Sequence, residues 1–245
     1  MAPPDQIASF DLSIRGRRVH FDIPVPTEPV RLGRMLPVFQ GLTDQFVDHA
    51  VQTARSEGRE VSCKAGCGAC CRQLVPIAEA EAHGIARLVA ELPEPRRRVV
   101  RERFAAARRS LEEAGLLDRL LAPETIRDEA VTSFGLEYFS AQVACPFLEA
   151  ESCSIYPDRP IACREYLVTS PAEHCAQPTA AEVRCVKLPA QVSRGVRRLD
   201  GGKWVPLVLA LEWSENQPEE NEERTGVHLL KSLLQEIARI GSPGQ

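Results

Sequence analysis

Apolar and polar residues alternate at the start of the chain, and helical spacing replaces the alternation further on. Residues 8–25 alternate on both sides of Arg15-Gly16, which predicts a β-hairpin turned at these two residues. From about Val30 to Arg59, apolar residues recur every three or four positions, which predicts a long amphipathic helix. The chain is therefore expected to begin with a hairpin and a helix.

Helical patterns continue through the middle of the chain. Pro76 stands at the start of an apolar stripe that ends near Glu91, and proline is frequent at a helix start. Residues 93–121 predict one or two further helices, and residues 124–142 predict another.

The last third of the chain changes pattern twice. Residues 194–211 predict a strand pair turned at Asp200-Gly201-Gly202, and residues 217–240 predict an acidic turn followed by an amphipathic helix. No internal repeat is visible. We therefore predict a single domain over residues 1–245, with an α+β, predominantly helical fold that combines small strand pairs with a cysteine-rich, irregular metal-binding centre.

Bulk composition excludes little but limits the partners. The 245 residues are 44% hydrophobic and carry a formal net charge of -4, which gives no general reason to expect nucleic acid or an anionic membrane. Residues 1–10 lack a secretory pattern, and residues 204–211 are too short to span a bilayer. We predict a cytoplasmic protein without membrane contact, whose partner is a protein or small-molecule substrate.

Two charge runs stand out. Residues 96–109 contain seven arginines and residues 212–223 contain six glutamates. Such runs are usually the solvated faces of surface elements, which is the interpretation that we favour. The alternative is a docking face for an acidic partner or RNA, but no aromatic residues interleave to stack on bases.

The chain has nine cysteines, which in a cytoplasmic protein indicate metal binding. Disulfides are rare where thiols are kept reduced, and an odd number of cysteines cannot pair completely. Four cysteines fall within residues 63–71, in a glycine-bearing loop: Cys63, Cys67, Cys70 and Cys71. Thiolates at this spacing suit zinc or iron–sulfur clusters. Because adjacent residues seldom bind one ion together, Cys70 and Cys71 are expected to point to different sides of the loop.

A second group of cysteines follows in the proline-punctuated residues 145–188. It comprises Cys145, Cys153, Cys163, Cys175 and Cys185. Helices leave the first group and return at Cys145, so we expect the two groups to meet in space. Cys185 lies in an alternating stretch and is the best candidate for a plain core cysteine. Arg164, beside Cys163, is expected to donate hydrogen bonds to thiolate sulfurs and so to help bind the cofactor.

The sequences CKAGCGACC and CPFL…CSIYPDRPIACREY resemble the YkgJ-type cysteine-cluster family, a zinc- or iron-chelating domain. The resemblance implies metal binding by Cys67, Cys70, Cys71, Cys145, Cys153 and Cys163, with Cys63 as an upstream member. It does not extend to His174, Cys175 or Cys185. The family is similar to the cysteine-rich part of flagellin lysine N-methylases, which implies an iron–sulfur centre and modification chemistry.

The spacing Cys63-x3-Cys67-x2-Cys70 is also that of radical S-adenosylmethionine enzymes. Ala69 stands where that superfamily usually has an aromatic residue, and the helices that follow do not fit its barrel. An alternative is an iron–sulfur cluster that has one iron with a free coordination position and is held by a different fold.

Two functions follow from these observations. The first is an iron–sulfur protein that acts in redox chemistry or in modification of a protein or small molecule, with residues 60–188 as its metal-binding region. The alternative is a structural zinc protein that serves as a scaffold for a partner or as a metal chelator. The metal ligands predicted for either are Cys63, Cys67, Cys70, Cys71, Cys145, Cys153, Cys163 and Cys175.

Overall fold

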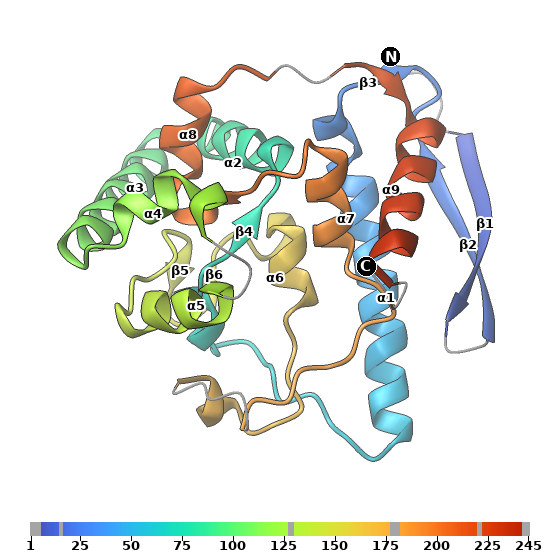
Figure 1. Ribbon diagram of the computed structural model, residues 1–245, viewed down its shortest axis with the longest axis horizontal. Helices are drawn as coiled ribbons and strands as arrows, with labels where there is room; N and C mark the ends of the chain where they lie inside the picture. The colour runs from blue at the N-terminus through green and yellow to red at the C-terminus, as the bar shows by residue number, and fades with distance from the viewer. Residues whose placement is uncertain (1–5, 15–16, 127–129, 177–181, 220–221, 242–245) are drawn as a thin grey trace.

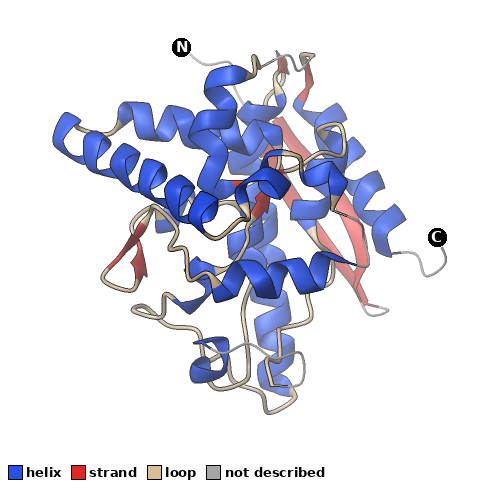
Figure 2. Ribbon diagram, turned by 60° about the vertical axis from the view of Figure 1, so that its left-hand side comes forward, coloured by secondary structure: helices blue, strands red, loops and turns tan. Residues whose placement is uncertain are grey.

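Helices dominate the structure and short antiparallel strand pairs join them (Figure 1). The computed structural model describes residues 6–14, 17–126, 130–176, 182–219 and 222–241. Its mainly helical α+β architecture confirms the fold class that the sequence predicts. Figure 2 shows that loops gather at one end of the molecule, at the bottom of the view, away from most of the helices.

The predicted N-terminal hairpin is confirmed. Strands β1 (Gln6–Ile14) and β2 (Arg17–Val25) pair antiparallel, with Phe10 opposite Phe21. The two rings stack with their centroids 5.5 Å apart. Phe21, Ile23 and Val25 alternate into the core, because successive side chains of a strand point to opposite faces. The predicted turn residues 15–16 lie outside the described residues.

Three helices build the core beneath this hairpin. They are α1 (Leu32–Ser56), α7 (Val192–Leu199) and α9 (Gly226–Gly241). Phe39, Leu42 and Phe46 recur at helical spacing on the buried face of α1, and each contributes about 1.5–3 kcal/mol relative to an exposed side chain. The predictions for residues 30–59 and for the C-terminal helix are therefore confirmed.

A second set of helices lies on the other side of the molecule (Figure 1). Its members are α2 (Glu79–Glu91), α3 (Glu94–Glu113), α4 (Leu117–Leu121), α5 (Val131–Ser140) and α8 (Ala210–Asn216). Two apolar clusters hold them together, one around Phe104 and Phe147 and one around Leu111 and Tyr138. The predicted helices between residues 93 and 142 are thus present, and the described part of residues 124–142 forms a helix only from Val131.

Short strand pairs connect distant parts of the chain. Their members are β3 (Pro29–Val30) with β8 (Arg224–Thr225), β4 (Pro76–Ile77) with β7 (Val205–Pro206), and β5 (Leu148–Glu149) with β6 (Ser152–Cys153). Short 3-10 turns fill the connections: η1 (Ala69–Arg72), η2 (Pro123–Thr125), η4 (Tyr156–Asp158), η5 (Ala172–Ala176) and η6 (Leu207–Leu209). Helix α6 (Ile161–Glu165) lies between η4 and η5.

The strand pair predicted within residues 194–211 is wrong. Residues up to Leu199 belong to α7, because Val192 and Val196, four residues apart, are both fully buried. The turn at Gly201 and Gly202 does form, with φ angles of 84° and 82° that favour glycine. The strand that follows it, β7, pairs with the distant β4 instead.

The helix predicted to open at Pro76 begins three residues later. Pro76 and Ile77 pair as β4, and Ala78 is still extended. Glu81 decides the start of α2, because one of its carboxylate oxygens accepts a 2.9 Å hydrogen bond from the Ala78 amide. The other oxygen accepts one of 2.9 Å from the Ile161 amide at the start of α6. The carboxylate of Glu81 therefore joins the starts of two helices.

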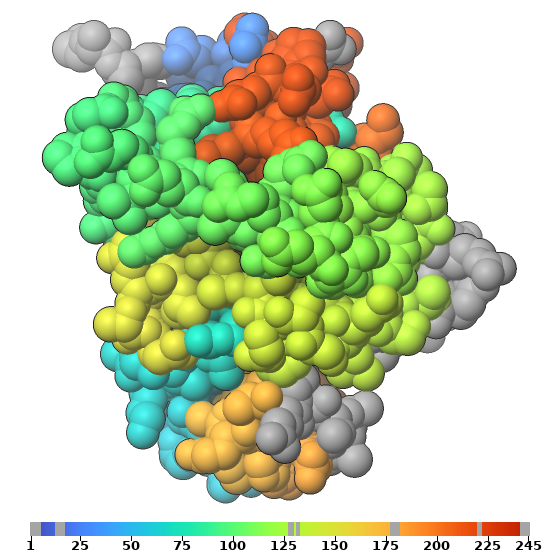
Figure 3. Space-filling view, turned by 90° about the vertical axis from the view of Figure 1, so that its left-hand side faces the viewer, coloured from blue at the N-terminus to red at the C-terminus, as the bar shows by residue number. Residues whose placement is uncertain are grey.

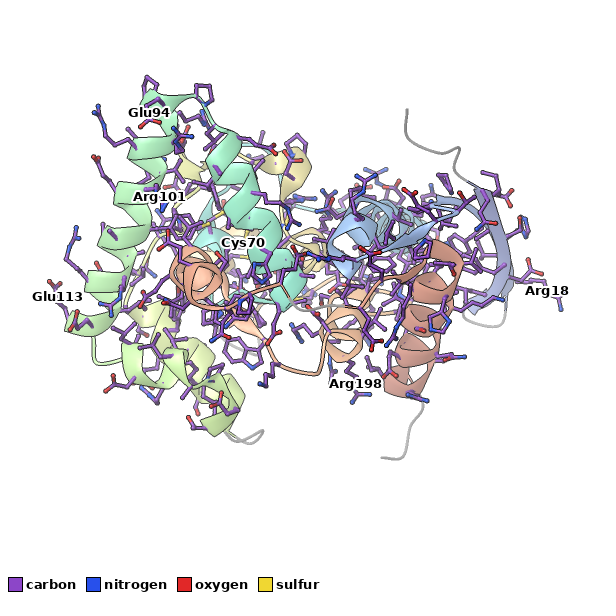
Figure 4. All side chains as sticks on the ribbon, turned by 90° about the horizontal axis from the view of Figure 1, so that it is seen from above. Arg18, Cys70, Glu94, Arg101, Glu113 and Arg198 are labelled. Carbon is purple, nitrogen blue, oxygen red and sulfur yellow. The ribbon has the colours of Figure 1, made fainter. Side chains whose placement is uncertain are left out.

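The two charge runs face each other across the surface. On α3, Arg108 Nε lies 2.7 Å from a carboxylate oxygen of Glu212, and Arg101 pairs with Glu215 on the same helix α8. Figure 4 shows Glu94, Arg101 and Glu113 along the outer side of α3. Exposed pairs of this kind contribute about 0–1 kcal/mol each. Much of the arginine charge is therefore compensated within the chain, in line with the solvated-face interpretation.

Among the residues that the structure describes, no helix combines the length and the apolar character needed to cross a bilayer.

Candidate metal centre

The first cysteine segment is a tight loop that leads into η1. The Cys67 amide donates a 3.1 Å hydrogen bond to the Lys64 carbonyl, and Gly66 takes a φ of 82° in this turn. At Gly68, an added Cβ would lie 2.7 Å from a side-chain atom of Leu148. Glycine is needed there because the β5–β6 hairpin closely approaches the backbone.

An ion pair fastens this loop to the hairpin. The guanidinium of Arg72 binds both carboxylate oxygens of Glu151, at 2.7 and 3.0 Å, and also donates to the Gly68 carbonyl at 3.1 Å. Bidentate pairing fixes orientation as well as distance. The Gly66 amide adds a 3.1 Å hydrogen bond to the Ser152 hydroxyl. The β5–β6 hairpin therefore holds the segment that bears the first four cysteines.

The two cysteine groups meet, as the sequence predicts. The amide of Cys145 donates a 2.7 Å hydrogen bond to the carbonyl of Cys71. Cys153 lies opposite Leu148 in the hairpin, and Cys163 lies in α6. In Figure 3 the cyan surface around residues 60–75 lies between the yellow surface of the hairpin region and the orange surface near residue 175.

Five thiols form what we call the inner group: Cys70, Cys71, Cys145, Cys153 and Cys163. Burial raises the pKa of Cys145 to about 12, and the neighbouring charges of Cys153 and Cys70 add to this effect. Burial also raises the pKa of Cys163 well above its usual range, with further contributions from Cys145, Cys70 and Cys153. Thiols that disfavour each other's ionisation need a cation to become thiolates together.

Cys70 is the exception in this group. Its pKa is lowered because the Cys71 thiol donates a hydrogen bond to its sulfur and because the positive charge of Arg159 is near. The same hydrogen bond raises the pKa of Cys71. This interaction between the two thiols does not agree with the prediction that their side chains point to different sides of the loop. Figure 4 labels Cys70, near the middle of the molecule in that view.

Arg159 is a cation close to the inner group. Its guanidinium carbon lies 3.9 Å from the centre of the Tyr156 ring, and its charge lowers the pKa of both Cys70 and Cys153. Its Nε is buried and has no hydrogen-bond partner among the described residues. The sequence analysis singled out Arg164 rather than Arg159, although Arg159 lies between Cys153 and Cys163.

Arg164, predicted to donate to thiolate sulfurs, has other partners. It donates to both carboxylate oxygens of Asp44 on α1, at 3.1 and 2.8 Å. It also donates to the carbonyls of Arg159, at 3.1 Å, and Pro157. Its side chain is therefore used to hold the turn before α6 against α1, which corrects the role that we predicted for it.

The remaining four cysteines form what we call the outer group: Cys63, Cys67, Cys175 and Cys185. Cys175 is buried, in η5, which contacts η1. Cys185 is exposed, so the prediction of a core cysteine is wrong. The hydroxyl of Tyr166 donates a hydrogen bond to its sulfur. His174 contacts the Glu182 carbonyl at 3.2 Å.

All nine cysteines are free thiols. No three His, Cys, Asp or Glu side chains within the described ranges are grouped tightly enough to hold a single metal ion as they stand. The donor chemistry is nevertheless that of a soft-metal site, since sulfur predominates and the neighbouring basic group is an arginine rather than a competing ligand. By fold and donor set, this is a cysteine-rich metal-binding protein.

The comparisons agree with this class. A family model described as "Putative zinc- or iron-chelating domain", CxxCxxCC, covers residues 62–186. The chain belongs to this family. Comparisons with curated proteins and with solved structures gave no match.

The charge of Arg159 makes a prediction about Cys70. In metal-free protein, Arg159→Gln removes the cation and should raise the pKa of Cys70, so less thiolate is present at pH 7. Alkylation of Cys70 by iodoacetamide, followed by peptide mass spectrometry, should slow several-fold. Lys64→Gln on the same loop is the control and should leave the rate unchanged. An equal rate in the Arg159 variant would contradict this electrostatic role.

Proposed function

We propose that this protein binds an iron–sulfur cluster through its inner group and acts in redox chemistry or in modification of a protein or small molecule. The observation that carries the proposal is that three segments bearing five thiols, the loop, the hairpin and α6, lie near one another, with a hydrogen bond from the Cys145 amide to the Cys71 carbonyl. Such a cluster would supply electron transfer or an iron with an open coordination position.

The number and placement of the thiols favour a cluster over a single ion. Zinc in a structural site takes four ligands, whereas the inner group contains five thiols, two of them on adjacent residues. A polynuclear centre distributes its ligands over several metal atoms, so adjacent cysteines need not share one. All five thiols, including Cys70 with its lowered pKa, would then be available to the cluster.

A cavity beside this group offers a place for a small substrate. It has a volume of about 250 Å³ and lies between α1 and α2, with Gln40, Leu88 and Asp158 among its lining residues. Pro160, the residue directly before α6, and Glu81 line it as well. The cavity therefore borders the helix that bears Cys163, and we propose it as the route by which a substrate approaches the centre.

The test is metal analysis of protein purified without oxygen. We expect brown protein with broad absorbance at about 400 nm and nearly equal amounts of iron and acid-labile sulfide. Cells supplied with both iron and zinc provide the fair comparison. Colourless protein with stoichiometric zinc would refute the proposal and support the structural zinc alternative, in which the metal joins the loop, the hairpin and α6.

A further inference from the structure

The outer group lies in its own frame of backbone contacts. Val168 is the centre of this frame: its amide donates a 3.4 Å hydrogen bond to the sulfur of Cys63, and its carbonyl accepts a 3.0 Å bond from the Ser62 amide. Val168 also forms an isolated antiparallel bridge with Cys185. Cys63 and Cys185 are thus held on either side of one buried residue.

Cys175 joins the same frame from a third direction. It lies in η5, which contacts η1, so it approaches the cysteine loop from the side opposite the hairpin. The bonds Thr169 N to Arg184 O and Val186 N to Leu167 O, both 2.8 Å, hold the segment of Cys185 next to the one that leads to η5. Figure 1 shows these cyan and orange loops side by side at the bottom of the molecule.

Electrostatic contacts divide the cysteines in the same way. The pKa of Cys175 is raised to about 11 by burial and by the charges of Cys63, Cys67, Cys70 and Cys185. The pKa of Cys63 is raised by burial and by Cys70, Cys67 and Cys185. The thiols of the hairpin and α6 are not among the largest causes of either shift. Cys70 affects both groups, so it lies at the boundary between them.

We infer that the outer group, Cys63, Cys67, Cys175 and Cys185, is a second thiolate metal site, separate from the inner group and binding zinc or iron. The inference rests on the proposed function, which assigns the inner group its own centre. Because the four thiols do not converge on one point as they stand, filling the site requires their loops to close around a metal ion or a small cluster. Most of these thiols lie outside regular secondary structure, which allows this closure.

The experiment counts metal centres by native mass spectrometry, with iron, sulfide and zinc measured in parallel. Wild-type protein should carry two centres. Cys175→Ser/Cys185→Ser should lose one centre and keep the other, while Cys145→Ser/Cys163→Ser should lose the complementary one. Iron and sulfide lost with the outer pair identify a second cluster there, and zinc lost alone identifies a zinc site.

Two outcomes overturn the inference. Either Cys175→Ser/Cys185→Ser retains the full metal complement, or it loses every centre while its circular dichroism stays native, which indicates one joint site. The single variant Cys185→Ser replaces an exposed thiol, so it takes the place of the double variant in the metal count if the double variant fails to fold. Wild-type protein without iron and sulfide refutes the proposed function alone, since two zinc centres, of which only one is lost with the outer pair, would still establish two sites.

Discussion

Cys163→Ser is expected to abolish metal binding at the inner group and to lower the free energy of unfolding of the metal-loaded protein by at least about 3 kcal/mol. Cys163 lies in α6. The thiols whose negative charge raises its pKa include Cys145 and Cys153 in the hairpin region and Cys70 in the loop. A metal bound by all three segments adds its binding free energy to folding, and loss of one ligand removes most of that contribution.

Denaturant unfolding of loaded and metal-free forms measures this effect. Serine is close to cysteine in size but brings a hydroxyl into a buried position, so the metal-free variant should be less stable than metal-free wild type by about 1–3 kcal/mol. The loaded forms should differ by clearly more than the metal-free forms. Equal metal content and an equal unfolding midpoint in loaded Cys163→Ser protein would show that α6 does not contribute a ligand.

Glu81→Gln is expected to destabilise the protein by about 2–4 kcal/mol, because Gln has one acceptor oxygen where Glu has two. The two oxygens of Glu81 accept bonds from Ala78 and Ile161, so Gln leaves one buried amide without its partner. Glu91→Gln, on the exposed end of the same helix, is the matched control and should change stability by less than about 0.5 kcal/mol.

The same residue makes stability depend on pH. Burial raises the pKa of Glu81 in the folded protein above its usual value. The folded state then binds more protons than the unfolded state between the two pKa values, so this group's contribution to stability falls as pH rises through that window. Glu81→Gln removes this contribution, and the difference in stability between variant and wild type should therefore shrink with increasing pH. A constant difference across the window would contradict a raised pKa.

The sequence predicted the parts of the fold that depend on local periodicity. The alternation in residues 8–25 and the helical spacing along α1 both place apolar side chains on one face, so strand and helix followed directly. The segment around Val196 misled because Asp200-Gly201-Gly202 has the sequence of a hairpin turn, which suggested strands on both of its sides. Packing of Val192 and Val196 against the core selected the helix, and packing is not visible in a local window.

The candidate site was predictable in its residues and less so in its geometry. Thiol spacing identified the cysteines, and the helical excursion between residues 72 and 144 predicted that the two groups meet. The role predicted for Arg164 was wrong because the sequence cannot show that Asp44 on α1 lies beside it. Likewise, the position of Cys185 depends on its bridge to Val168, a long-range pairing.

The order of the cysteines along the chain has a consequence for biosynthesis. The ribosome completes the loop with Cys70 and Cys71 well before α6, since Cys163 follows roughly 90 residues later, about 5–20 s of synthesis at ordinary rates. During that interval Arg159, whose charge helps to lower the pKa of Cys70, has not been made either, so the thiolate becomes favoured only when the second cysteine segment arrives. The sulfur of Cys70 is thus activated at the same stage of synthesis that supplies its neighbours Cys145, Cys153 and Cys163.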